Sequence, residues 1–210
     1  MTLVELLVAM TIMAFLTTMI IGTWISLTKA YSFTSRSDRQ RDFANQAIAR
    51  MAREIRDAQQ VPGSTSAAFV RAYPNEVRLY STFNMAGNSD PTSTPRLTRF
   101  ILRETDPVQH VGTIYREFPG ADGLFDTGDD VSSALVKDVV NLRQHTDLFT
   151  YWAINATTGK MDPSSGMTTL VPAARIQTVG ILLFVDLNPG KSPNYMDIST
   201  TVEPRNVRHL

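Results

Sequence analysis

One acidic stretch of the sequence has residue types and spacing that suit metal binding. Gly120-Ala-Asp-Gly-Leu-Phe-Asp-Thr-Gly-Asp-Asp130 carries four aspartates, which are Asp122, Asp126, Asp129 and Asp130. Carboxylate and carbonyl oxygens wrapped around a loop are the ligands that Ca²⁺ prefers, so the stretch predicts a calcium site at these aspartates. It lacks the regular alternation and the terminal glutamate of an EF-hand. Since Asp-Gly and Thr-Gly-Asp also form ordinary turns, an acidic hairpin tip without metal is the alternative.

A second acidic group is a single carboxylate in an apolar sequence. Glu5 is the only charged residue among residues 1–28. A charged side chain at membrane depth costs about 2.5–3.5 kcal/mol on insertion scales and usually marks function. Glu5 therefore either reaches the water interface from the end of a helix or pairs with a cation within the membrane.

The sequence shows no motif for catalysis, disulfide bonding or nucleotide binding. The sequence has no cysteine, which excludes disulfides, thiolate metal sites and cysteine nucleophiles. His110, His145 and His209 are scattered, and no zinc-protease, hydrolase or phosphate-loop motif is present. The formal net charge is zero, so the overall charge does not predict a nucleic-acid partner. We expect a protein that is not an enzyme.

The first element that must position Glu5 is an apolar helix over residues 1–28. A helix from Met1 to Leu27 measures about 40 Å at 1.5 Å per residue, which exceeds a hydrocarbon core of about 30 Å. The segment lacks the basic start and the small-residue cleavage site of a secretory signal. We expect a membrane helix that is retained.

The helix is expected to continue through residues 29–61 as an amphipathic half. Apolar residues recur there at three- and four-residue spacing and define one stripe, which suits packing on a folded domain. The stripe consists of Ala44, Ala47, Ile48, Met51, Ala52 and Ile55. The opposite face is rich in arginine and could meet acidic groups of neighbouring subunits, acidic lipid headgroups or nucleic acid. Val61-Pro62-Gly63-Ser64 is expected to end the helix after Gln60.

Residues 62–210 change to short runs that are typical of strands, and they predict a β-rich globular domain. The expected strands are 68–73, 76–82, 97–104, 113–117, 149–154, 176–186 and 199–207. The run from Val179 to Val185 is almost continuously apolar, which indicates a strand covered on both faces. The sequence thus predicts an α+β fold: a long N-terminal helix, membrane-spanning in its first half, packed on an antiparallel sheet.

The segment Met1-Thr-Leu-Val-Glu-Leu-Leu-Val-Ala-Met10 resembles the mature N-terminus of type IV pilins and type II secretion pseudopilins. The resemblance implies that a prepilin peptidase removes a short basic leader and that Met1 becomes N-methylated. It also implies that Glu5 pairs with the Met1 amine of a neighbouring subunit during assembly. Methionine replaces the phenylalanine that is commoner at the first position of this family. Major pilins often carry a proline near position 22 and lose helical structure there; Gly22 is a weaker helix breaker, so local melting and an unbroken helix are both expected alternatives.

Further stretches resemble the larger minor subunits of this family, the J-type pseudopilins and the W-type minor pilins. They are Met51–Ala58, Leu148–Trp152, Ile176–Val185 and Ser199–Asn206. The resemblance implies a structural subunit of a type IV pilus or related filament, built from identical or related pilins and handled by assembly machinery. It places the chain in a bacterial inner membrane before assembly and then in an extracellular filament. Adhesion, twitching motility, DNA uptake and conduction all use this subunit architecture, so the resemblance does not select among these roles. A pseudopilin in a periplasmic pseudopilus is the alternative, and a membrane-anchored binding protein or enzyme is the second one.

Overall fold

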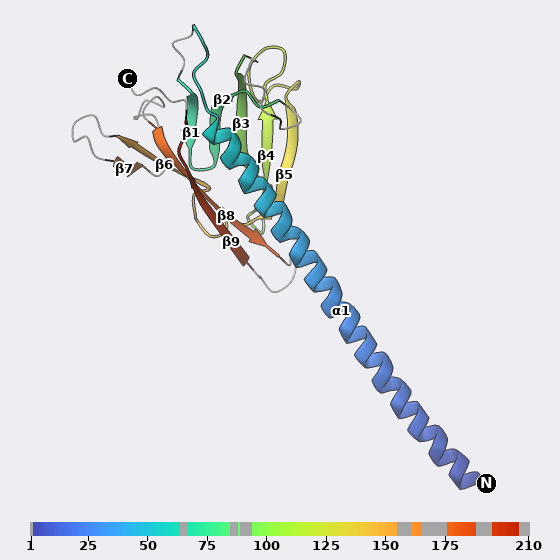
Figure 1. Cartoon of the computed structure of the whole chain (residues 1–210). Helices are drawn as coiled ribbons and strands as arrows, with labels where there is room; N and C mark the ends of the chain where they lie inside the picture. Colours follow the sequence, from blue (N-terminus) through green and yellow to red (C-terminus); the bar gives the residue numbers. More distant parts are fainter. Residues whose placement is uncertain are drawn as a thin grey trace. The chain divides into compact units, whose positions relative to one another are not determined.

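The computed structural model describes residues 2–63, 67–84, 88, 94–154, 161–164, 176–187 and 195–205. These residues form one long apolar N-terminal helix followed by a curled antiparallel sheet (Figure 1). The predicted α+β architecture is therefore confirmed.

Helix α1 runs from Leu3 to Arg56 and comprises 54 residues. It is long and apolar enough to cross a membrane. By packing, the chain divides into two units, residues 1–39 and residues 40–210, so the dividing point lies inside the predicted amphipathic half. Helix α1 continues through Gly22 without interruption in this single subunit.

The helix ends four residues earlier than the sequence predicts, at Arg56 rather than Gln60. The chain leaves the helix because the sheet offers competing partners for its polar groups. The Asp57 carboxylate accepts hydrogen bonds from the backbone N–H and the hydroxyl of Thr82, and the Gln59 N–H donates to the Tyr80 carbonyl. These hydrogen bonds to the sheet replace those that a further turn of helix would make. The helix could not have continued past Val61-Pro62 in any case, because proline lacks a backbone N–H and disfavours helix in the residue before it.

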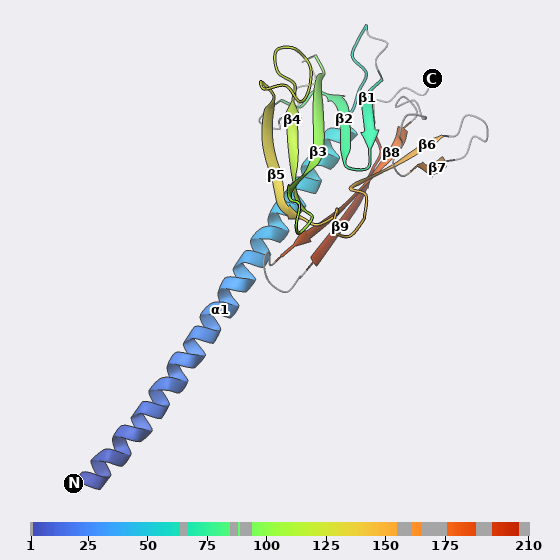
Figure 2. The same ribbon diagram turned by 180° about the vertical axis from the view of Figure 1, so that it is seen from behind.

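The described residues form a nine-stranded sheet in the order β1-β2-β3-β4-β5-β8-β6-β7, and β9 pairs with the other edge of β8. All neighbouring strands are antiparallel. The strands are β1 (Phe69–Tyr73), β2 (Glu76–Ser81), β3 (Arg96–Asp106), β4 (Val111–Phe118), β5 (Val131–Val139), β6 (Phe149–Ile154), β7 (Met161–Ser164), β8 (Ile176–Asp186) and β9 (Tyr195–Val202). Strands β5 and β8 meet only at Val139 and Val185, and there the sheet turns from the β1–β5 part into the β6–β9 part (Figures 1 and 2).

Seven strands lie where the sequence predicts them, although β9 begins at Tyr195 instead of Ser199. Two strands escape the sequence pattern. Strand β5 begins Val131-Ser132-Ser133 and its first four residues are exposed, so it lacks the alternation of a half-buried strand. Strand β7 contains Pro163, which is tolerated because β7 is an edge strand.

The core of residues 40–210 forms where the predicted apolar stripe of α1 meets one face of the sheet (Figure 2). Ala44, Ala47, Met51 and Ile55 are at most 2% exposed, and they belong to one cluster with buried residues of eight strands. The alanines let the helix approach the sheet closely, while Met51 and Ile55 fill the space between strands. Truncating either of these two large side chains to alanine is expected to cost about 2–5 kcal/mol of stability.

Candidate functional site

The first turn of α1 is closed by a reciprocal pair of hydrogen bonds between Thr2 and Glu5. The Thr2 backbone N–H donates to a Glu5 carboxylate oxygen at 2.7 Å, and the Glu5 N–H donates to the Thr2 hydroxyl at 3.4 Å. This is a capping box, which satisfies helix N–H groups that otherwise have no partner. The carboxylate also lies at the positive end of the helix dipole. The signal was present in the sequence as Thr-x-x-Glu, but sequence reasoning gave Glu5 no partner within its own chain.

The predicted pairing of Glu5 with the amine of a neighbour's Met1 is not tested, because Met1 lies outside the described residues. The N-methylation predicted at Met1 likewise falls there. Within residues 2–39, Glu5 is the only acidic side chain before Asp38. The capping box therefore offers the carboxylate a partner inside a single subunit, before any neighbour is met.

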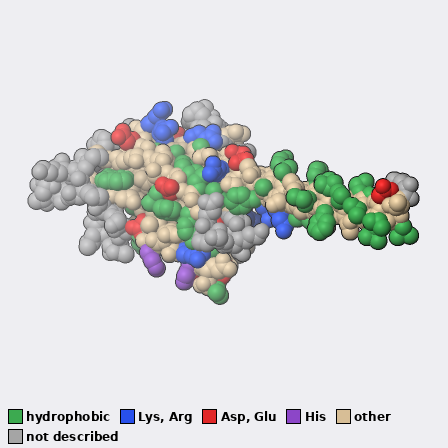
Figure 3. All heavy atoms as spheres, turned by 90° about the horizontal axis from the view of Figure 1, so that it is seen from below, with side chains coloured by type: hydrophobic (Ala, Val, Ile, Leu, Met, Phe, Trp, Pro, Cys, Tyr) green, Lys and Arg blue, Asp and Glu red, His purple; other side chains and the backbone are tan. Residues whose placement is uncertain are grey.

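The helix presents an unpartnered apolar surface in the unit formed by residues 1–39. Large apolar side chains are exposed all along the helix between Leu3 and Leu27. Figure 3 shows them as the green surface on one face of the helix. Leu3 is 82% exposed and Trp24 is 73% exposed. A surface of this kind requires lipid or other helices around it, because exposing so much apolar area to water is unfavourable.

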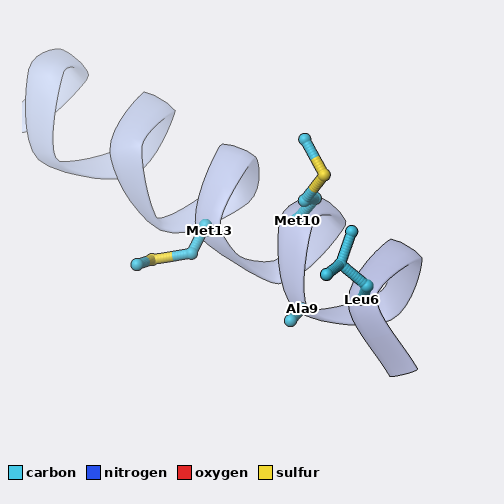
Figure 4. Close-up of a pocket in the computed structure, with 4 residues that line it drawn as sticks. All are labelled: Leu6, Ala9, Met10 and Met13. Carbon is cyan, nitrogen blue, oxygen red and sulfur yellow. The ribbon is translucent and has the colours of Figure 1, made fainter. Parts of the chain in front are cut away.

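Two hollows on this surface have the spacing of a helix-packing hole. The first is lined by Leu6, Ala9, Met10 and Met13, and Figure 4 shows the short Ala9 side chain among three longer ones. The second is lined by Met19, Ile20, Thr23, Trp24 and Leu27. Residues i, i+3, i+4 and i+7 form the hole that accepts a side chain of a facing helix, and four lining residues of the second hollow repeat the first set 14 residues later. The helix can therefore receive side chains of other helices at two points.

Polar groups within the apolar part of α1 are satisfied by the helix itself. The hydroxyls of Thr11, Thr17, Thr18, Thr23 and Thr28 each donate to the carbonyl four residues earlier, at 2.7–2.9 Å. If this part of the helix lies in lipid, each of these five hydroxyls therefore keeps a hydrogen-bond partner. A Cβ placed on Gly22 would meet nothing within 4 Å. Melting of the helix near Gly22 in an assembled filament stays a prediction, since the single subunit is helical there.

The acidic stretch forms the loop between β4 and β5, and an arginine on β3 fixes it to the sheet. The guanidinium of Arg99 is fully buried and donates two hydrogen bonds to the Asp126 carboxylate, at 2.8 and 2.9 Å. It also donates to Glu117 on β4 at 2.7 Å and lies 4.4 Å from the centre of the Phe125 ring. Arg103 adds a further bond to Asp126 at 3.1 Å. Nothing in the sequence pattern had indicated Arg99, Arg103 or Glu117 as partners of the loop.

The charges of this cluster shift the pKa of both central groups. Hydrogen bonds from Arg99, and then from Arg103, lower the pKa of Asp126 well below its ordinary range. Burial lowers the pKa of Arg99, but the hydrogen bonds that it donates to Asp126 and Glu117 outweigh this effect and raise its pKa above the ordinary value. Both side chains therefore stay ionised throughout the physiological range.

The remaining aspartates of the loop serve its turns. Asp122 accepts from the Leu124 N–H at 2.9 Å, Asp129 accepts from the Ala121 N–H at 2.8 Å, and Asp130 accepts from the Asp126 N–H at 2.6 Å. Among the residues described, no group of three or more acidic or histidine side chains is arranged to hold a metal ion. The structure thus does not bring the four predicted calcium ligands together around one point, because arginines hold Asp126 while the other three carboxylates accept backbone N–H bonds.

A second ionic cluster links the end of α1 to the sheet. The Arg116 Nε on β4 donates to the Glu54 carboxylate at 2.9 Å, and both side chains are at most 1% exposed. Arg50 approaches the same carboxylate at 3.4 Å, one helical turn earlier. Burial raises the pKa of Glu54, and the charge of Arg116 offsets part of the rise. This pair fixes which residues of α1 face β4.

The sequence matches no model of a known protein family, and it matches no curated protein. A long apolar N-terminal helix packed on an antiparallel sheet is compatible with a pilin-like fold.

Proposed function

We propose that this protein is a structural subunit of a type IV pilus or a pilus-like filament. The observation that carries the proposal is the unpartnered apolar surface of α1 between Leu3 and Leu27, joined in one chain to a folded β-rich domain. Such a helix suits two successive surroundings: the inner membrane before assembly, and a bundle of sister helices afterwards. The resemblance of residues 1–10 to mature pilins supports the same conclusion.

Assembly in this proposal exchanges lipid contacts for helix contacts. Hydrophobic attraction does not drive association between helices in lipid, so close packing and polar pairs must select the arrangement. The two hollows on α1 provide places for side chains of neighbouring helices. Glu5 would leave its bonds with Thr2 and pair with the Met1 amine of a neighbour, which sets the axial position of one subunit against the next.

The test is the substitution Glu5→Ala in the full-length protein. We expect the protein to reach the membrane fraction normally, because the substitution makes the helix more apolar. Filament yield, measured by electron microscopy of sheared surface filaments and mass spectrometry of their main band, should fall severely. Asp38→Ala, which removes an exposed carboxylate farther along the same helix, is the matched control and should assemble. Normal filaments from Glu5→Ala would contradict the assigned role of Glu5.

A pseudopilin of a type II secretion system is the second candidate, and the resemblance of Leu148–Trp152 and Ile176–Val185 to J-type pseudopilins favours it. These segments form β8 and most of β6, which pair with each other in the sheet. The two candidates differ in what a cell lacking the protein loses. Loss of surface filaments with normal secretion supports the pilus, whereas loss of protein secretion without a change in surface filaments supports the pseudopilus.

A further inference from the structure

A group of cations follows the apolar part of α1 directly. Lys29, Arg36 and Arg39 are exposed, and the first of them stands two residues after Leu27. None of the three forms an ion pair with any residue in the described part of the chain. Figure 3 shows Lys and Arg side chains beside the helix where its apolar covering ends. Within the described residues, no salt bridge uses these three charges.

The helix places the three cations on one side and directs them toward its apolar part. Residues seven apart share a face, so Lys29 and Arg36 are aligned, and Arg39 lies one turn beyond Arg36. Side chains of an α-helix lean toward its N-terminus, which here is the membrane side. Asp38 follows Arg36 by two residues and therefore points away from it.

Aromatic residues mark where the membrane boundary falls. Glu5 and Trp24 are nineteen residues apart, or about 28 Å along the helix, which matches a hydrocarbon core of about 30 Å. Trp24 is 73% exposed and Tyr31 is 77% exposed, and both residue types favour the headgroup layer. With Trp24 at the boundary, Lys29 lies about 7 Å beyond it, at the depth of lipid phosphates. Arg36 and Arg39 lie about 18 and 22 Å beyond Trp24 along the helix, and their side chains lean back toward the headgroups.

We propose that Trp24, Lys29, Tyr31, Arg36 and Arg39 form a membrane-interface anchor that binds the phosphate groups of anionic phospholipids. The aromatic rings fix the depth of the helix, and Lys29 binds headgroups by charge and hydrogen bonding. Arg36 and Arg39, whose side chains lean back toward the surface, attract the same headgroups by charge over about a Debye length. The anchor rests on the proposed function in one respect, since it requires that α1 be in a membrane before assembly.

Lipid is favoured over nucleic acid by the position of the cations. A duplex would have to approach a short basic segment that emerges directly from the membrane surface, whereas lipid phosphates lie at the depth of the first cation, Lys29. The formal net charge of zero gives no long-range attraction for nucleic acid.

The test uses the full-length protein in vesicles of phosphatidylcholine and phosphatidylglycerol, in which the lipids that remain bound are counted by native mass spectrometry. We expect phosphatidylglycerol to be enriched around the wild type, by up to roughly fivefold for each cation at low salt. A triple variant with Lys29→Gln, Arg36→Gln and Arg39→Gln should lose the enrichment. The matched control replaces Arg53, Arg96 and Arg143, which are exposed in the other unit, with glutamine and should keep it.

Enrichment that persists in the triple variant would overturn the anchor. So would enrichment in the wild type that does not fall between 0.05 and 0.5 M salt, a measurement that stands even if the triple variant fails to insert. Binding of a short DNA duplex that disappears in the triple variant, while the lipid ratio stays unchanged, would assign the cations to nucleic acid instead. Wild-type protein that enriches phosphatidylglycerol but never forms filaments would remove the proposed function and leave the anchor in place.

Discussion

The guanidinium of Arg116 donates to the carboxylate of Glu54 over 2.9 Å, and both side chains are shielded from water. Arg116 also donates to the Asn84 carbonyl at 2.9 Å and stacks 4.3 Å from the centre of the Phe118 ring. The pair joins the last turns of α1 to the middle of the β1–β5 part of the sheet. A buried ion pair adds little net stability relative to apolar residues, but it penalises every arrangement in which one charge stays buried alone. Glu54 and Arg116 therefore select one position of the helix on the sheet.

Breaking this pair on one side should be costlier than removing it altogether. We expect Glu54→Ala or Arg116→Ala to lower the free energy of unfolding by about 3–5 kcal/mol. The first leaves Arg116 buried without its carboxylate, and the second leaves the buried Glu54 with Arg50 alone, at 3.4 Å. The double variant Glu54→Met with Arg116→Met should lose less than either single variant. Thermal unfolding of the full-length protein in detergent, followed by the β-sheet circular dichroism signal, measures all three. Arg50→Ala is the control, because Arg50 is partly exposed and contacts the same carboxylate only at 3.4 Å. Purely additive losses would show that the two charges do not act as a pair.

The Asp126 cluster predicts a particular dependence of stability on pH. The pKa of Asp126 is lowered by Arg99 in the folded protein, so the folded state binds this proton more weakly than the unfolded state. The stabilisation is present above the ordinary aspartate pKa and is lost as pH falls below it toward the lowered value. Asp126→Asn should lower the melting temperature at pH 7 and weaken its fall between pH 5 and pH 2. Asp122→Asn removes a carboxylate that has no arginine partner among the described residues. It should leave the fall of the melting temperature between pH 5 and pH 2 as it is in the wild type.

Calcium is a separate prediction for the same loop. The four aspartates were predicted as ligands, yet Asp126 is held by two arginines and the other three accept backbone N–H bonds. We therefore expect the melting temperature to be the same in millimolar calcium and in excess EGTA. A rise with calcium that is abolished in Asp122→Asn or Asp129→Asn would restore the calcium site, because ligand binding to the folded state must raise its stability.

The sequence could predict features that depend on local pattern. The apolar stripe of Ala44, Ala47 and Met51 has a helical period, and it forms the core contact that this period requires. Strand β8 was predicted with its observed bounds, because a continuous apolar run has few other uses in a sheet of this kind. Strand β5 was missed because its exposed, serine-rich start has no period-two signal.

The ionic clusters could not be predicted, and the reason is physical. Arg99 precedes Asp126 by 27 residues, and Arg116 follows Glu54 by 62. A repeating pattern of neighbouring residues carries no information about pairs that lie so far apart in the sequence. These charges are brought together only by the register of β3 with β4 and by the packing of α1 on the sheet. The Thr2–Glu5 capping box is the opposite case, since its two residues are only three positions apart and were overlooked in favour of a partner in another subunit.

Two variants can separate the two roles of Glu5. Glu5→Gln retains a side chain that can accept from the Thr2 N–H, so the capping box survives, but it has no charge to pair with an amine. Thr2→Ala removes the hydroxyl that accepts from the Glu5 N–H, at a cost of about 0.5–2 kcal/mol in the first turn, and it leaves the carboxylate intact. If pairing between subunits determines assembly, Glu5→Gln should form as few sheared filaments as Glu5→Ala, while Thr2→Ala should still assemble. The reverse result, with filaments from Glu5→Gln and none from Thr2→Ala, would make Glu5 a helix cap and remove its role between subunits.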